Sequence, residues 1–276
     1  MRPLLVMDGD SFAHRAYHAL PGSMRRQDGG PENALLGFTD MMLRLWRDER
    51  PRAVLVAWDS LDVPTYRHEA LAAYQSGRVF EGDLLAQLDL LPGLVESTGF
   101  AAAKAPGYEA DDFLAAAAAQ EEAAGGTALV ATSDRDAFQL VTDRVTVLQP
   151  AKGGAARIGP AEVRERYGVD PAQVPDFIAL RGDPSDRIPG ARGIGPKRGA
   201  ELLAQYGSLD AMLEAGRFAT EAEMLRLYRR IATMDRDAPL PPLPDANPDW
   251  TSAAAHATKL GAARVARRFE EALAWT

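Results

Sequence analysis

The chain has 276 residues, of which 46% are hydrophobic and 25% are charged, and it contains no cysteine. These values are typical of a folded protein with one large or two small domains, and they exclude disordered chains, disulfide frameworks and cysteine-ligated metal centres. No run of residues approaches the roughly 18 apolar residues of a membrane span, so we expect a soluble, cytoplasmic protein without a membrane partner. The net charge of −8 argues against a nucleic-acid partner only if the acids are evenly spread, and here many are clustered.

The first half of the chain alternates apolar runs with helical patterns. Continuous apolar runs predict buried strands at residues 3–7, 53–58, 100–104, 128–132 and 145–148. The segments between them predict helices at residues 32–48, 82–98 and 108–124. Apolar strands separated by helices predict an α/β core over residues 1–157, with a mostly parallel central sheet flanked by helices. The order of the strands stays open.

The second half, from about residue 158, has no convincing strand. Glycine and proline punctuate short predicted helices at residues 160–167, 171–180, 196–206, 209–215 and 221–235. A proline-rich segment at residues 238–248 is too stiff and too poor in N–H donors to form a helix or a central strand, and a final helix is predicted at residues 254–274. We therefore expect residues 158–276 to form an all-helical region.

Acidic residues collect where the predicted strands and helices end. The first strand runs into Asp8, the second into Asp59, and the fourth is followed by Asp134. Because the carboxyl ends of parallel strands line the binding crevice of an open α/β sheet, we expect these acids to converge. The complete set of acids at such positions is Asp8, Asp59, Glu109, Asp111, Asp112, Asp134, Asp136, Asp183 and Asp186.

Each of these acids alone has an ordinary structural interpretation. Aspartate after a strand is a common turn residue, and acids in a first helical turn are favoured by capping and by the helix dipole. Converging carboxylates, however, repel one another and raise one another's pKa unless cations share the site. Oxygen ligands favour hard ions such as Mg²⁺ or Mn²⁺, and two such ions about 4 Å apart suit in-line attack on a phosphodiester. The pattern as a whole predicts a metal-dependent nuclease.

A second motif, at residues 193–198, has the sequence Gly-Ile-Gly-Pro-Lys-Arg. The glycines allow a tight turn, Pro196 suits a first helical position, and the N-terminus of the following helix presents free N–H groups to a phosphate. Lys197 and Arg198 would add charge to this contact. The alternative interpretation is an ordinary helix–turn–helix connection.

Six motifs, in a fixed order, resemble the 5′-nuclease domain of bacterial DNA polymerase I and the flap endonuclease family. They lie at residues 15–21, 64–69, 107–112, 132–136, 179–190 and 193–197. The resemblance implies a PIN/flap-nuclease-like fold whose helical region contains a helix–hairpin–helix motif of the H3TH type at about residues 177–207. It further implies a free-standing 5′–3′ exonuclease and flap endonuclease without an attached polymerase domain.

The resemblance also implies roles for the acids, which would hold two or more Mg²⁺ or Mn²⁺ ions. Around the first ion it places Asp8, Asp59, Glu109 and Asp111. The resemblance also implies that five acids complete the second ion site and its outer shell, namely Asp112, Asp134, Asp136, Asp183 and Asp186. The residues that would take part directly in catalysis are Asp8, Asp59, Glu109, Asp111, Asp134, Asp136, Asp186 and Arg78.

Residues 66–84 correspond to the arch of the family, which covers the single strand of the DNA. By resemblance, Tyr74 stacks on a base near the scissile bond, Arg78 contacts its phosphate, and the hairpin grips the duplex backbone, often with a K⁺ ion on its carbonyls. The implied DNA-binding residues are Arg15, Tyr17, Arg67, Tyr74, Gln75, Arg78, Gly193, Ile194, Gly195, Lys197 and Arg198. From local sequence alone, a solvated amphipathic helix at residues 66–84 is an equally good interpretation.

Two positions depart from the family pattern. Gln75 stands where the family usually has lysine, and it can donate a hydrogen bond but offers no ammonium to a phosphate. We therefore expect Gln75→Lys to raise the turnover rate. Arg187 stands where asparagine is typical, and it would either pair with Asp186 or Asp183 or reach the DNA.

Three functions are consistent with the sequence. The favoured one is a structure-specific 5′ nuclease that acts as a monomer on 5′ flaps, branched or nicked duplexes and 5′ ends during replication and repair. An RNase built on the same acidic α/β core is disfavoured by the arch-like segment and the hairpin. A non-catalytic binder of DNA structures is disfavoured because all nine acids are present.

Overall fold

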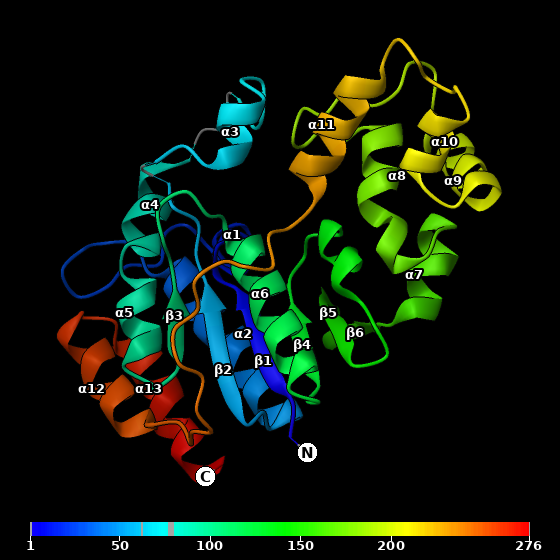
Figure 1. The fold of residues 1–276 in the computed structure, drawn as a ribbon. Coiled ribbons are helices and arrows are strands. Elements are labelled where there is room, and N and C mark those ends of the chain that lie inside the picture. Colours follow the sequence, from blue (N-terminus) through cyan, green and yellow to red (C-terminus); the bar gives the residue numbers. More distant parts are fainter. Residues whose placement is uncertain (1, 62, 77–79, 276) are drawn as a thin grey trace.

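The computed structural model describes residues 2–61, 63–76 and 80–275. A central sheet has the strand order β3-β2-β1-β4-β5-β6, in which β1 to β5 are parallel and β6 is antiparallel to β5 (Figure 1). The strands are β1 (Leu4–Asp8), β2 (Ala53–Ala57), β3 (Ala101–Ala103), β4 (Ala128–Ala131), β5 (Val145–Ala151) and β6 (Gly154–Ile158). The predicted mostly parallel α/β core is confirmed.

Helices follow in three groups. Those between the strands are α1 (Gly9–Ala19), α2 (Asn33–Glu49), α3 (Tyr66–Ala70), α4 (Gly82–Leu88), α5 (Leu91–Glu96), α6 (Ala110–Ala123) and the 3₁₀ helix η1 (Asp136–Leu140). A helical region follows the sheet, with α7 (Pro160–Tyr167), η2 (Pro171–Gln173), α8 (Val174–Arg181), α9 (Pro196–Tyr206), α10 (Leu209–Glu214) and α11 (Ala222–Ala232). The chain closes with α12 (Trp250–Lys259), α13 (Ala263–Ala272) and η3 (Leu273–Trp275).

The sheet is buried on both faces, which explains why its strands are continuous apolar runs. In β1, Leu4 and Val6 join the hydrophobic cluster that includes α6 and α8, whereas Leu5 and Met7 join the cluster on the other face, which includes α2, α12 and α13. This alternation follows from the pleat of the strand, since successive side chains point to opposite faces. Packing on both faces of the sheet therefore holds the carboxyl end of β1 in place.

The C-terminal helices lie apart from the helical region. Helix α13 packs against α2, and α12 packs against α5, on the side of the molecule away from α9 and α10 (Figure 1). Trp250 and Phe269 are fully buried in this contact. Of the residues expected to form one helical region, 158–276, the last two helices therefore pack on the sheet, because the apolar faces of α12 and α13 complete its core.

Other differences from the sequence-based expectations have local causes. Strand β6 was not expected, because its sequence Gly-Ala-Ala-Arg-Ile has little β propensity, and it forms only as a hairpin partner of β5. The single helix predicted at residues 254–274 is two helices, which part at Gly261 with a φ of 70°. Likewise, the helix predicted at residues 82–98 is divided into α4 and α5, with proline in the first turn of α5. Helix α1 was not predicted.

The topology places a ligand-binding edge between β1 and β4. The chain runs from β1 to β2 and β3 on one side, and then returns to β4 on the other side of β1. Binding crevices form at the carboxyl ends of strands at such a switch point. Across the described residues, we find no helix with the length and hydropathy that crossing a bilayer requires.

Candidate active site

A cleft of about 1960 Å³ opens at the carboxyl end of β1 and β4 and extends along one side of α9. Every predicted acid except Asp112 lines this cleft. The acids gathered at strand and helix ends are Asp8, Asp10, Asp59, Glu109, Asp111, Asp134, Asp136, Asp183 and Asp186, and Glu201 of α9 also lines the cleft. The convergence that the strand ends predict is therefore confirmed.

The acids nearest to β1 are held by backbone and hydroxyl donors. Asp8 is the N-cap of α1, where its Oδ1 accepts from the Ser11 N–H at 2.9 Å and its Oδ2 accepts from the Thr132 hydroxyl at 2.7 Å. Asp10 Oδ2 accepts from the Asp59 N–H at 2.7 Å, and Asp59 Oδ1 accepts from the first N–H of α6 at 2.8 Å. These bonds link the ends of β1, β2 and α6. They leave the remaining carboxylate lone pairs available to other partners.

Asp10 is the acid that sequence reasoning missed. It lies two residues after Asp8, in the first turn of α1, and it is buried. A signal was present in the sequence, because the Asp-Gly-Asp run at residues 8–10 directly follows the first strand. Because helix α1 was not predicted, the sequence pattern did not indicate that Asp10 would lie in the same cleft as Asp8.

Two further acids of the cleft, Asp183 and Asp186, lie on the loop that follows α8. Asp183 and Ile188 exchange two backbone hydrogen bonds of 2.8 Å, which close the loop that carries Asp186. The flanking Gly182 and Gly190 both have a φ of 78°, and a Cβ on Gly190 would lie 2.4 Å from the Gly182 nitrogen. Only glycine fits such a contact and such a backbone conformation. The loop that aims these carboxylates into the cleft thus requires both glycines.

Burial raises the pKa of several carboxyl groups in the cleft. Desolvation raises the pKa of Asp8 to about 7, with smaller contributions from the charges of Asp59 and Asp134. Desolvation also raises the pKa of Asp186 to about 6, against the lowering effect of a hydrogen bond from Gln75. For Asp10, Asp111 and Asp136, desolvation and neighbouring carboxylates hold the pKa well above its usual value. Without a cation, the protein therefore disfavours the ionised form of these carboxyl groups.

The donor set of the cleft fits hard divalent cations. Arg181 lies 3.3 Å from Asp183, and Arg67 lies 3.6 Å from Glu109, but in the part of the chain that the structure describes no ion pair reaches Asp8, Asp111 or Asp136. Carboxylate oxygens are the ligands that Mg²⁺ and Mn²⁺ prefer. Within the same described residues, no three acidic or histidine side chains are already arranged around one ion position.

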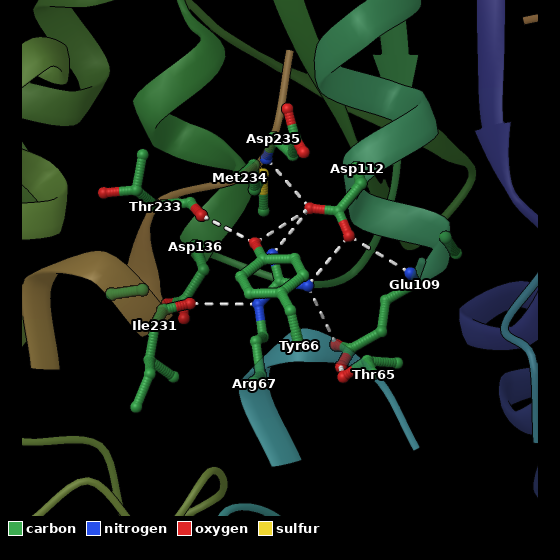
Figure 2. Close-up of polar contacts among 12 residues, drawn as sticks. Thr65, Tyr66, Arg67, Glu109, Asp112, Asp136, Ile231, Thr233, Met234 and Asp235 are labelled. Atoms are coloured by element: carbon green, nitrogen blue, oxygen red, sulfur yellow. Dashed lines mark hydrogen bonds and ion pairs between the residues drawn. The ribbon is translucent and has the colours of Figure 1, made fainter. Parts of the chain in front are cut away.

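Asp112 has a different role from the one the resemblance implies. Its carboxylate is fully buried and takes two hydrogen bonds, of 2.7 and 2.8 Å, from the Arg67 guanidinium (Figure 2). It also accepts from the backbone N–H of Asp235 at 2.8 Å, while Arg67 Nε donates to the Ile231 carbonyl at 3.0 Å. We call these four residues (Arg67, Asp112, Ile231 and Asp235) the Arg67 clamp. The clamp joins α3, α6 and the end of α11, and it holds Asp112 outside the set of carboxylates that line the cleft.

Two predicted DNA-binding residues in the segment 66–84 have buried protein partners in this structure. Arg67 is 3% exposed and its donors are occupied by the clamp. Tyr74 is likewise 3% exposed, packs edge-on against His68, and donates its hydroxyl to Glu109 Oε2 at 3.0 Å. Neither side chain offers a free face to DNA, because both hold the base of this segment on α6. The predicted contact of Arg78 lies outside the described residues.

Gln75 and Arg187, the two departures from the family pattern, both adopt left-handed backbone conformations. Gln75 has a φ of 44°, and its amide nitrogen donates to Tyr74 and Asp186 rather than facing solvent. Arg187 has a φ of 57° and lines the cleft as an exposed side chain. Among the described residues, neither expected ion pair of Arg187 with Asp183 or Asp186 is formed.

The predicted helix–hairpin–helix is present as α8, a tight loop and α9. Gly193 has a φ of 76°, Ile194 N–H donates to the Ala191 carbonyl at 3.1 Å, and Gly195 is the N-cap residue that precedes Pro196 in the first turn of α9. Lys197 and Arg15 are exposed and line the cleft.

Other basic positions differ in their surroundings. Arg198 is exposed and pairs with Glu201 at 2.9 Å. Tyr17, a predicted DNA contact, instead donates its hydroxyl to Glu81 at 2.7 Å. Arg135 and Arg166 also line the cleft, and neither was predicted. Arg166 lies outside the six motifs, and Arg135 lies inside one of them at a position to which no role was assigned.

Known families match both halves of the chain. Residues 3–168 match the 5′-3′ exonuclease, N-terminal resolvase-like domain, and residues 169–248 match the 5′-3′ exonuclease, C-terminal SAM fold. DNA polymerase I of Mycobacterium tuberculosis is 41% identical over 256 residues, covering 88% of this chain and 28% of that protein. The thermostable DNA polymerase I of Thermus thermophilus is 38% identical over 248 residues, covering 86% and 29%. The chain thus spans less than a third of the length of these relatives.

Solved structures share the fold over the whole chain. The T5 5′-exonuclease with bound divalent zinc ions aligns with a TM-score of 0.69 at 19% identity, covering 99% of both chains. The catalytic core of Rad2 in complex with DNA substrate aligns with a TM-score of 0.63 at 15% identity, covering 99% of this chain and 92% of that one. Because these sequence identities are low, the two structures support the fold alone.

Proposed function

The chain belongs to the 5′-3′ exonuclease family of structure-specific 5′ nucleases, and on this premise we propose that it hydrolyses DNA phosphodiesters with two or more divalent ions, Mg²⁺ or Mn²⁺. The observation that carries the proposal is the convergence of carboxylates from β1, β2, α6, β4 and the loop after α8 in one cleft. The bound zinc ions of the T5 exonuclease support divalent ions as the class of cofactor.

The carboxylates of the cleft would hold the ions. Bound divalent ions supply a nucleophilic water at neutral pH and neutralise charge on the phosphate. Ser11, Thr132 and the N-terminus of α6 orient Asp8 and Asp59 before binding, which limits the rearrangement that ions demand. Exposed Arg15 and Lys197 on the walls attract the phosphate backbone toward the otherwise negative cleft.

The hairpin before α9 would position the duplex. Contacts from backbone N–H groups and from Lys197 to phosphates fix the register of DNA without reading its sequence. Selection would therefore depend on DNA structure, with 5′ flaps, branched or nicked duplexes and 5′ ends as substrates. The DNA substrate bound to the Rad2 core supports this interface, and we propose a K⁺ ion at the hairpin carbonyls. Such substrates arise in replication and repair, where we propose that the protein acts as a cytoplasmic monomer.

Cleavage of a 5′-end-labelled double-flap DNA tests the proposal. With Mn²⁺ or Mg²⁺, we expect a product one nucleotide longer than the flap, and with EDTA no product. Asp134→Asn should abolish cleavage, whereas Asp143→Asn, which changes an exposed acid outside the cleft, should not. Preferential cleavage of the matching RNA flap would instead identify an RNase. Tight flap binding without cleavage in any metal would identify a structural binder.

A further inference from the structure

The side chain of Gln75 lies between two acids from distant parts of the chain. Its Nε2 donates to Asp186 Oδ1 at 3.0 Å and to the Tyr74 hydroxyl at 3.0 Å. The Tyr74 hydroxyl in turn donates to Glu109 Oε2 at 3.0 Å. A continuous path of hydrogen bonds thus runs from Glu109, at the N-terminus of α6, to Asp186, in the loop after α8.

Donor and acceptor roles along this path are fixed by its ends. Carboxylates accept, a tyrosine hydroxyl donates one bond, and only the nitrogen of the Gln75 amide carries two hydrogens to donate. If the amide were turned over, its oxygen would face the Asp186 carboxylate without a hydrogen between them. The amide therefore holds both acids without adding a charge to the cleft.

The backbone of Gln75 is directed to the same partner. Its N–H donates to the Asp186 carbonyl at 3.3 Å, and its φ of 44° lies in the left-handed region. A non-glycine residue in that region costs about 1 kcal/mol, so surrounding contacts must hold it there. Main chain and side chain of one residue therefore both connect the segment after α3 to the Asp186 loop.

We propose that Gln75 is a positioning residue that fixes the separation of Glu109 and Asp186 before any ion binds. It acts through these acids, and it does not contact the scissile phosphate as the resemblance to the family implies. This inference rests on the proposed function, because it treats the two acids as ion ligands. One consequence is that a change at position 75 alters the affinity for divalent ions even when no DNA is present.

Neutral and charged replacements at position 75 separate the effect of losing the hydrogen-bond donor from the effect of adding a positive charge. Gln75→Met has a similar length but no donor, so it should lower the affinity for Mn²⁺ by about 10-fold, as expected when an orienting hydrogen bond is lost. Gln75→Lys keeps the donors but adds a positive charge beside Asp186. It should raise the melting temperature in EDTA, because it offsets repulsion among the acids, and lower the Mn²⁺ affinity, because it competes with the ion.

Titration calorimetry with Mn²⁺ alone, combined with thermal unfolding in EDTA, makes the test. Gln120→Met and Gln120→Lys are matched controls, since Gln120 is exposed on α6 and does not line the cleft. Gln75→Ser, too short to reach both partners, is the second neutral variant should Gln75→Met fail to fold. Reduced Mn²⁺ affinity in the neutral variants supports the inference. A higher melting temperature in EDTA together with a lower Mn²⁺ affinity in Gln75→Lys supports it as well.

Two negative results have different meanings. Mn²⁺ affinities equal to that of the wild type in the neutral variants overturn the positioning role of Gln75 and leave the proposed nuclease intact. Absence of Mn²⁺ binding by the folded wild type overturns the proposed function itself, and the inference with it.

Discussion

Asp111 and Asp112 are neighbours in the first turn of α6, yet they belong to two different environments. Asp111 is half-buried and lines the cleft among other carboxylates. Asp112 is fully buried and is neutralised by the Arg67 clamp. Because consecutive helical residues project about 100° apart, one turn can supply both environments.

The contrast shows how a protein can separate acids that stabilise its fold from acids that are reserved for ligands. The clamp satisfies its carboxylate with a guanidinium and backbone N–H groups, so Asp112 needs nothing from outside. The cleft gathers carboxylates whose pKa is raised by desolvation and by one another, so it gains by binding cations. Five predictions test this distinction between the two environments.

The largest effect on stability should come from the clamp. Asp112→Asn removes the carboxylate that accepts from both terminal nitrogens of the buried Arg67 guanidinium and leaves it the longer ion pair with Glu109, so the free energy of unfolding should fall by about 3–5 kcal/mol. Asp111→Asn removes a repelling charge instead and should leave stability in EDTA unchanged or higher, while flap cleavage is lost. Urea unfolding in EDTA and cleavage assays on both variants check this. Equal destabilisation by the two substitutions would abolish the distinction between the environments.

Divalent ions should stabilise the cleft next most strongly. At a Mn²⁺ concentration of 100 times Kd, the folded state should gain about 2.7 kcal/mol by mass action. The melting temperature of the wild type should therefore rise with millimolar Mn²⁺ or Mg²⁺, and that of Asp111→Asn should rise less. A well-folded wild type that shows no shift would speak against a clustered ion site.

Without metal, the cleft should also make stability depend on pH. Burial raises the pKa of Asp8 to about 7 and that of Asp186 to about 6, above the value near 4 of an unfolded aspartate. The folded state therefore binds more protons, and the contribution of these groups declines as the pH rises from about 4 to 7, by up to about 1.4 kcal/mol per pH unit and group. The difference in the free energy of unfolding between wild type and Asp8→Asn, measured against pH in EDTA, isolates the contribution of Asp8. A difference that is independent of pH, or that changes in the opposite direction, contradicts the raised pKa.

A charge at position 75 should increase the rate of the chemical step. Gln75→Lys places an ammonium beside Asp186, where it can stabilise charge on the phosphate, so the single-turnover rate should rise by up to about 10-fold at saturating Mn²⁺. Saturating metal is required because the same charge should weaken ion binding. A rate equal to or below that of the wild type would show that position 75 supplies no such stabilisation.

The smallest expected effect concerns the backbone of the Asp183–Ile188 loop. Arg187 has a φ of 57°, a conformation that asparagine adopts more readily than arginine. Arg187→Asn should stabilise the protein by about 0.5–1 kcal/mol in urea unfolding. Arg192→Asn, which removes the same charge from an exposed residue without a positive φ, serves as the control. A loss of stability specific to Arg187→Asn would show that its side chain has a structural role.

Much of the fold was predictable because it depends on local patterns. Continuous apolar runs predicted the five parallel strands, and the carboxyl ends of those strands predicted where Asp8, Asp59 and Asp134 would meet. Strand β6 was not predictable, because Gly154–Ile158 becomes a strand only through pairing with β5. The position of α12 and α13 was not predictable either, since an amphipathic helix does not specify which apolar surface it will cover.

For the active site, the kind of chemistry and its approximate place could be predicted from sequence: oxygen ligands at the ends of parallel strands, and a glycine-rich hairpin that precedes a helix. The partners of each side chain depend on the tertiary structure. Arg67 lies 45 residues from Asp112, and Gln75 lies 111 residues from Asp186. No local pattern reports such pairings, because the packing of α3 and α11 on the core determines which carboxylate meets a guanidinium or an amide and which remains for an ion.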